Sequence, residues 1–146
     1  MTAPILRHIS KIEYCAAYHL RSAIILPAQA RALIKDVMPW QELPLVGLAQ
    51  VETSDEVERG MRLYTTKLTA TLCQPFNFSL FTINSARPLA FRLTDVQGRQ
   101  YLLGTSQPPY PLVSQTETKG NKPTDRTAYT FNIQHTSPNS LLEIST

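Results

Sequence analysis

The sequence predicts a single all-β domain, built as an antiparallel sandwich or barrel with at most one or two short helices. The chain divides into short apolar segments separated by turn signals, which is typical of such folds. Eleven prolines against five glycines interrupt any long helix. A length of 146 residues suits one domain, so we expect residues 1–146 to form one β unit.

The clearest local signal is a β-hairpin within residues 88–104. Asp95 and Gly98 fit the first and last positions of a type I turn, and Gly98 can adopt the positive φ of a G1 bulge. This turn places Asp95 opposite Arg99 and fixes the register. The expected pairs are Thr94 with Gln100, Leu93 with Tyr101, Arg92 with Leu102, and Phe91 with Leu103. Arg92 and Tyr101 then lie on opposite faces and cannot form one stacking platform.

The N-terminal third predicts short strands and one short helix. β-Branched and aromatic content favours a strand over 5–14, although the apolar spacing mixes strand and helix periods. A second short strand covers 23–26 and ends at Pro27. Residues 28–36 contain strong helix formers directly after Pro27 and predict a helix of about two turns. A strand over 32–37 is the alternative.

The middle of the chain predicts two strands joined by a helical turn. Residues 45–53 have little polar interruption, and Thr53 to Glu56 match the capping-box pattern of a helix that ends near Gly60. The acidic residues of this corner indicate a solvated helix cap rather than a calcium loop. The longest strand covers 61–73, with Leu68, Ala70 and Leu72 on its inner face. Residues 74–87 fit either a strand and turn or a loop that carries aromatic side chains outward.

The C-terminal third combines strands with polar or proline-rich segments. Prolines around Tyr110 predict either a rigid connector or a segment that partners recognise. Residues 115–126 are predicted to form a mobile polar loop. Residues 127–135 alternate cleanly, with Phe131 and Ile133 inward, and 141–144 form a last short strand.

Charge, cysteine count and hydropathy exclude several classes of protein. A net charge of +3 is small for a nucleic-acid-binding protein. Cys15 and Cys73 are too few for a disulfide scaffold or metal cage; we expect two buried free thiols, with a single bridge as the alternative. The chain has no signal-peptide pattern and no apolar run of membrane-spanning length, so we expect a cytoplasmic protein with no membrane partner.

The sequence contains no catalytic signature. Motifs for nucleophile elbows, phosphate-binding loops, dinucleotide sites and zinc helices are absent, and His8, His19 and His135 share no ligand spacing. We therefore expect no enzyme activity, no catalytic residues, no cofactor and no metal site. Nucleic acid is not an expected partner either, because Glu117 and Asp125 oppose the cations of the 115–126 loop.

Five residues are candidates for partner contact. Trp40, in a loop bounded by prolines, is either an exposed anchor or a side chain that folds back over the core. Tyr110 lies in the proline-rich segment that a partner would recognise. The polar loop adds three basic residues, Lys119, Lys122 and Arg126.

The hairpin sequence also resembles a group of phage-related proteins. Residues 91–104, followed by Pro109-Tyr110-Pro111, are similar to small β-rich proteins of prophage and mobile-element regions of gut bacteria. Some of those proteins look like tail or head–tail components. The resemblance implies ring or tube assembly, with the 115–126 loop or the proline-rich segment reaching a neighbour.

We therefore predict a non-enzymatic structural or assembly protein with protein partners or self-association, in the cytoplasm or in a phage-like particle. The alternative is a ligand-binding β module for carbohydrate or nucleic acid, which Trp40, Tyr110 and the basic balance motivate. The sequence does not specify a small-molecule ligand.

Overall fold

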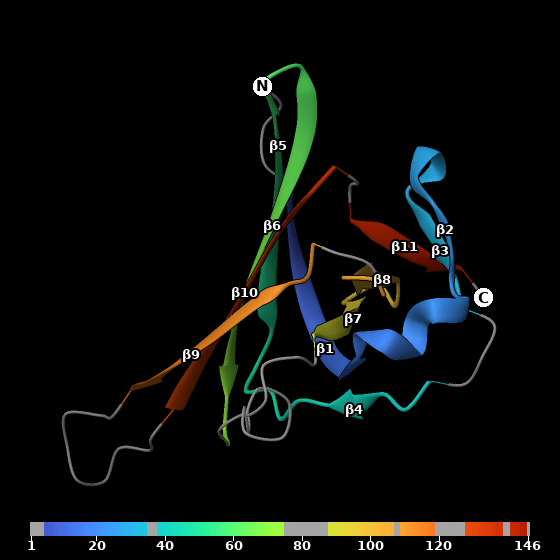
Figure 1. Ribbon diagram of the computed structural model, residues 1–146. Helices are drawn as coiled ribbons and strands as arrows, with labels where there is room; N and C mark the ends of the chain where they lie inside the picture. Colours follow the sequence, from blue (N-terminus) through green and yellow to red (C-terminus); the bar gives the residue numbers. More distant parts are fainter. Residues whose placement is uncertain are drawn as a thin grey trace, which may run out of the picture.

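Strand β1 (Ile5–Ala16) lies at the middle of one large, mostly antiparallel sheet (Figure 1). The computed structural model describes residues 5–34, 38–74, 88–106, 109–118, 128–138 and 141–145. The sheet order is β2-β3-β11-β8-β7-β1-β5-β6-β10-β9, with β4 paired to β1 beside this path. Among the strands of the described ranges, only β11 and β3 pair in parallel.

The elements follow one another mostly as strands. They are β1, the 3₁₀ helix η1 (Ala17–Ser22), β2 (Ile24–Leu26), the 3₁₀ turn η2 (Pro27–Gln29), β3 (Arg31–Leu33), β4 (Gln41–Glu42), β5 (Ala49–Glu58), β6 (Met61–Leu72), β7 (Leu89–Asp95), β8 (Gln100–Leu103), β9 (Leu112–Thr118), β10 (Ala128–Ser137) and β11 (Leu142–Ser145). The predicted all-β character is confirmed. The sheet is open and is not closed into a barrel, because β2 and β9 stand at its two ends.

The predicted hairpin is confirmed in register and turn. β7 and β8 form the four expected pairs, and the Asp95 amide donates to the Arg99 carbonyl at 2.9 Å. Gly98 has the expected positive φ, +89°. The Asp95 carboxylate also accepts hydrogen bonds from the amides of Gln97 and Arg99, both at 2.9 Å. The Asp95 side chain therefore stabilises the turn through its backbone amides.

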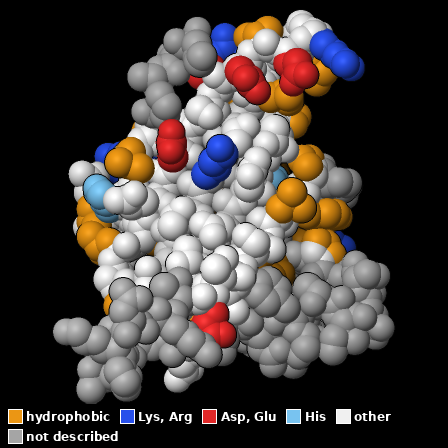
Figure 2. Space-filling view, turned by 90° about the vertical axis from the view of Figure 1, so that its left-hand side faces the viewer, with side chains coloured by type: hydrophobic (Ala, Val, Ile, Leu, Met, Phe, Trp, Pro, Cys, Tyr) orange, Lys and Arg blue, Asp and Glu red, His pale blue; other side chains and the backbone are white. Residues whose placement is uncertain are grey.

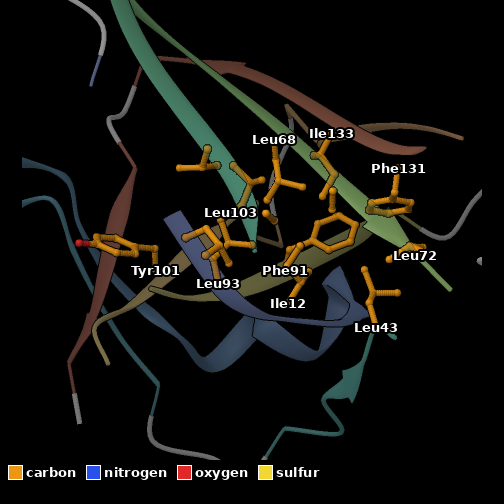
Figure 3. Packing of buried hydrophobic residues seen from close by; sticks show 14 of the residues in the cluster. Ile12, Leu43, Leu68, Leu72, Phe91, Leu93, Tyr101, Leu103, Phe131 and Ile133 are labelled. Carbon is orange, nitrogen blue, oxygen red and sulfur yellow. The ribbon is translucent and has the colours of Figure 1, made fainter. Parts of the chain in front are cut away.

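The first hydrophobic cluster joins two halves of the curved sheet. Phe91 of β7 and Phe131 of β10 are both fully buried, with ring centroids 6.2 Å apart (Figure 3). Three strands, β1, β5 and β6, separate β7 from β10 in the sheet order. The sheet must therefore curve strongly to bring the inner faces of its two halves together. Buried residues from β1, β5, β6 and β8 complete the cluster.

A second, smaller cluster lies on the other face of the β7–β8 half. Leu20 of η1 and Leu102 of β8 are each 2% exposed, and Ala32, Ala90 and Leu142 pack with them. η1 thus covers this half of the sheet. Burial on both faces explains why β7 and β8 read as nearly continuous apolar segments.

A β-bulge in β1 explains the mixed apolar spacing of residues 5–14. Ile9 pairs with Asp95 and Lys11 with Thr94, which leaves Ser10 as the extra residue. The bulge shifts the alternation by one position, so that Ile9 and Ile12 both reach the first cluster. The Ser10 hydroxyl donates toward the carbonyls of Thr94 and Asp95 at 3.2 and 3.3 Å.

The predicted helical turn over 53–60 is wrong. These residues continue β5 into a hairpin with β6, in which Glu58 pairs with Met61. Arg59 and Gly60 form the two-residue turn, with φ values of +52° and +79°. Two positive φ angles are typical of a type I′ turn, which suits the twist of a β-hairpin. Gly60 therefore serves the turn rather than a helix end.

The predicted helix over 28–36 is also wrong. Ala30 has a φ of +52°, which a right-handed helix cannot contain, and the chain then enters β3. The alternative strand is partly correct, since β3 covers 31–33. Ala32, fully buried between β2 and β11, shows that packing overrides helix propensity here.

Two other predictions fall partly outside the described residues. The polar loop predicted at 115–126 is wrong for residues 115–118, which belong to β9 and pair with β10. Residues 119–127 lie outside the described residues. So do residues 75–87, for which the sequence predicted either a strand and turn or a loop with outward aromatic side chains.

Candidate interaction surface

Trp40 folds back over the core, as one of its two interpretations predicted. It is half-buried against the second cluster, and the Arg92 guanidinium lies 5.0 Å from the centre of its ring. An arginine in this position binds the ring through a cation–π contact. Trp40 is therefore committed to the protein's own packing.

Tyr110 has a similar place. It is half-buried against the second cluster, and its hydroxyl donates to the Ser106 carbonyl at 3.2 Å. His135 of β10 approaches the same segment, with Nε2 3.0 Å from the Pro109 carbonyl. Burial lowers the pKa of His135, an effect that this carbonyl partly offsets. These contacts favour the connector interpretation of the proline-rich segment.

The residue that the sequence does not single out is Glu13. It faces Arg92 across β1 and β7, and its two carboxylate oxygens accept hydrogen bonds from Arg92 Nε and a terminal nitrogen at 2.8 and 2.7 Å. The Glu13 side chain is only 8% exposed and Lys11 Nζ lies 3.9 Å away. Glu13 and Arg92 thus form a partly buried ion pair, and the Trp40 ring packs against its arginine.

The two cysteines are free and differ in environment. Cys15 is buried and Cys73 is exposed, so the prediction of two buried thiols is wrong for Cys73. Burial raises the pKa of Cys15 to about 11, despite an opposing effect of the Arg92 charge. At neutral pH this thiol is protonated and is a poor nucleophile.

Within the described ranges, no group of three potential metal ligands gathers. The acidic residues predicted to surround a helix cap instead lie along the β5–β6 hairpin. Asp55 forms an ion pair with Arg62, and Glu56 and Glu58 are exposed. Glu56 and Glu58 are exposed to solvent as predicted, but they lie in a strand rather than at a helix cap.

The outer face of β6, β10 and β9 carries two rows of side chains, all of them polar except Leu112. Lys67, Gln134 and Leu112 form one row, and Thr69, Asn132 and Ser114 form the next. Between the rows lies a hollow of about 330 Å³, which the intervening residues Leu68, Ile133 and Val113 also line. Figure 2 shows this side of the molecule, where uncharged side chains and backbone cover most of the described surface.

Strand β9 borders this face and ends the sheet. Its seven residues pair with β10 on one side, and no strand among the described residues pairs with its other side. Ser114, Thr116 and Glu117 are exposed, and Leu112 is 72% exposed. The strand contains no proline or lysine, the residues that most often protect an edge from pairing.

A second exposed feature is the projecting hairpin, residues 53–66 of β5 and β6. Its end rises beyond the rest of the sheet (Figure 1). Val57 and Met61 near the turn are 64% and 58% exposed. Such apolar side chains on an extended arm are available to a neighbouring molecule.

The remaining predicted contact residues, Lys119, Lys122 and Arg126, lie outside the described residues. Of the five candidates, Trp40 and Tyr110 come together at the second cluster, and neither lines the hollow on the outer face. Within the described part of the chain, no helix has the length and apolar character that crossing a membrane requires. The chain matches no known protein family, no curated protein and no solved structure.

Proposed function

We propose that the protein is a non-enzymatic structural or assembly subunit. The observation that carries this proposal is strand β9, a seven-residue edge strand beside a mostly uncharged polar face. The outer edge of such a strand presents backbone N–H and C=O groups that another strand can satisfy. Because no charged side chain of β9 other than Glu117 opposes an approaching strand, the edge favours pairing.

The projecting hairpin supports the same function. Val57 and Met61 keep more than half of their surface in water, at a cost that a partner would remove. The Asp55–Arg62 ion pair links the two strands of this arm near its end. An arm of this kind can reach a neighbouring subunit while β9 pairs elsewhere.

The resemblance of residues 91–104 and 109–111 to phage-related proteins suggests the type of assembly. We infer a ring or tube of the tail or head–tail kind, formed in the cytoplasm or incorporated in a phage-like particle. In such an assembly the two halves of the curved sheet would act as the two layers of a sandwich. Their contact through Phe91 and Phe131 supports that interpretation.

Light scattering across a protein concentration series tests the proposal. The mean molar mass is expected to rise above that of the 16.4 kDa chain as concentration increases. A mass that stays at one chain at the highest soluble concentration would count against self-assembly. Replacing Val57 and Met61 with serine tests whether the projecting hairpin contributes.

The hollow on the outer face favours a second candidate function, binding of a carbohydrate. Its walls include the amides of Asn132 and Gln134, the hydroxyls of Thr69 and Ser114, and the Lys67 amine. These groups can donate to and accept from sugar hydroxyls. Lys67 is the only cation that lines the hollow among the described residues, which favours a sugar over a nucleic acid.

A glycan-array experiment with wild type and Asn132→Ala/Gln134→Ala tests this second function. Binding that the double variant loses and a Thr71→Ala control retains would support it. No glycan bound by the wild-type chain would contradict it.

A further inference from the structure

We propose that strand β9 pairs with β9 of a second copy of this chain, antiparallel and centred on Gln115. The inference rests on the proposed assembly function and names the partner. It joins two ten-strand paths at their β9 ends into one continuous sheet. Four features of β9 lead to this arrangement.

The first feature is length. β9 offers seven residues, whereas β2 at the opposite end of the sheet offers three. A neighbour that supplied β2 would leave most of the β9 edge unpaired. A second β9 matches the edge along its whole length.

The second feature is the pattern of side chains about Gln115. Antiparallel pairing centred there places Ser114 opposite Thr116 of the other copy, and the symmetry repeats this pair. Hydroxyl side chains facing each other across two strands form favourable pairs. The outer face already contains one example, since the hydroxyls of Thr65 and Thr136 lie 3.2 Å apart across β6 and β10.

The third feature is charge. Glu117, the one charged residue of β9, would face Val113 of the other copy. The two Glu117 side chains would then be offset by four residues, about 13 Å along the strands. That separation exceeds the screening length of about 8 Å at physiological salt. A parallel, in-register pair would instead place the two carboxylates side by side, so the antiparallel arrangement is favoured.

The fourth feature is the surface on either side of the junction. Ser114 and Thr116 are exposed on the outer face, and their neighbours on β10, Asn132 and Thr130, are uncharged. The outer face would therefore continue across the junction without bringing like charges together. A twofold axis through Gln115 also gives each copy the same contacts, as in the commonest kind of protein dimer.

Charge variants of Ser114 and Thr116 test this pairing. In Ser114→Lys/Thr116→Lys, both cross-strand pairs become lysine against lysine, and sedimentation equilibrium should show dimerisation roughly 100-fold weaker than in wild type. In Ser114→Lys/Thr116→Glu, both pairs combine opposite charges, and the dimer should be retained. Ser114→Glu/Thr116→Glu should be monomeric alone and form a mixed dimer with the double-lysine variant.

Thr69→Lys/Thr71→Lys is the matched control. It adds the same two charges to exposed positions of β6, away from the edge, and should leave dimerisation unchanged. Far-UV circular dichroism shows whether each variant retains its sheet.

The outcomes separate this inference from the proposed function. If Ser114→Lys/Thr116→Lys associates as strongly as the wild-type chain, β9 pairing is overturned and assembly must use another surface. Association lost in all three β9 variants and not restored by mixing would also overturn it, and would indicate that β9 pairs with a different strand. A wild-type chain that remains monomeric at every concentration would overturn both.

Discussion

Replacing Arg92 with methionine should destabilise the fold substantially, because it leaves the Glu13 carboxylate buried without its main partner. Glu13 is 8% exposed and receives two hydrogen bonds from Arg92. Removing one partner of a buried ion pair costs about 3–5 kcal/mol. Lys11, 3.9 Å from Glu13 and 44% exposed, compensates in part, which places the expected loss near the lower end, at about 3 kcal/mol.

The loss of the contact between Arg92 and Trp40 adds about 0.5–1 kcal/mol. Urea unfolding, followed by circular dichroism and by the fluorescence of Trp40, the only tryptophan, measures both effects. Arg99→Met is the matched control. Arg99 is exposed, and its replacement should change the free energy of unfolding by less than about 0.5 kcal/mol.

A double variant separates the ion pair from simple packing. Glu13→Met/Arg92→Met removes both charges and should recover most of the stability that Arg92→Met loses, because no unpaired charge remains. Equal free energies of unfolding for Arg92→Met and Arg99→Met would refute the reasoning. So would a double variant whose loss equals the sum of the two single losses.

Three further predictions concern the core, a glycine and the thiols. Phe131→Ala should lower the free energy of unfolding by about 3–5 kcal/mol, because its buried ring joins the two halves of the sheet; a loss below about 1 kcal/mol in urea unfolding would contradict that contact. Gly104→Ala should lower the melting temperature more than Gly47→Ala does, since both have positive φ but only at Gly104 would a Cβ approach Pro111, at 2.9 Å. At pH 8 a maleimide should label Cys73 rapidly and Cys15 slowly, because Cys15 is buried and its pKa of about 11 keeps it protonated; Cys73→Ser should abolish the fast phase, and rapid labelling of both thiols in the native protein would show that Cys15 is accessible.

Local signals were enough to predict the β7–β8 hairpin completely. Asp95 and Gly98 define its turn within five residues of sequence, and the alternation on either side agrees with that register. Strands β6 and β10 were also predictable, because each has one solvent-exposed face and one buried face. In these elements, nearby residues carry all the information that sets the structure.

Elsewhere, tertiary contacts outweigh the local signals. The helix formers of residues 28–36 give way to β3, because Ala32 is buried between β2 and β11. The capping-box pattern at 53–56 is part of β5, where pairing with β6 satisfies the backbone. The extra residue Ser10 mixes two periods in β1, and only its pairing with β7 shows why.

The candidate surface depends on strand order, which the sequence does not encode locally. Glu13 and Arg92 meet because β1 and β7 are neighbours, although 79 positions separate them in the chain. Strand β9 becomes an edge only through the order of the whole sheet. Of the predicted contact residues, Trp40 and Tyr110 were identified by type and by loop position, and their packing with the second cluster gives them a structural role.

Hydrogen–deuterium exchange of residues 112–118 at several protein concentrations tests assembly through β9 most directly. Pairing with a second copy would add protection to the outward-facing amides of β9 as concentration rises, while β6, which is paired on both sides by β5 and β10, would exchange at a constant rate. Exchange of the β9 amides that does not change with concentration, in a range where light scattering detects association, would contradict assembly through this edge.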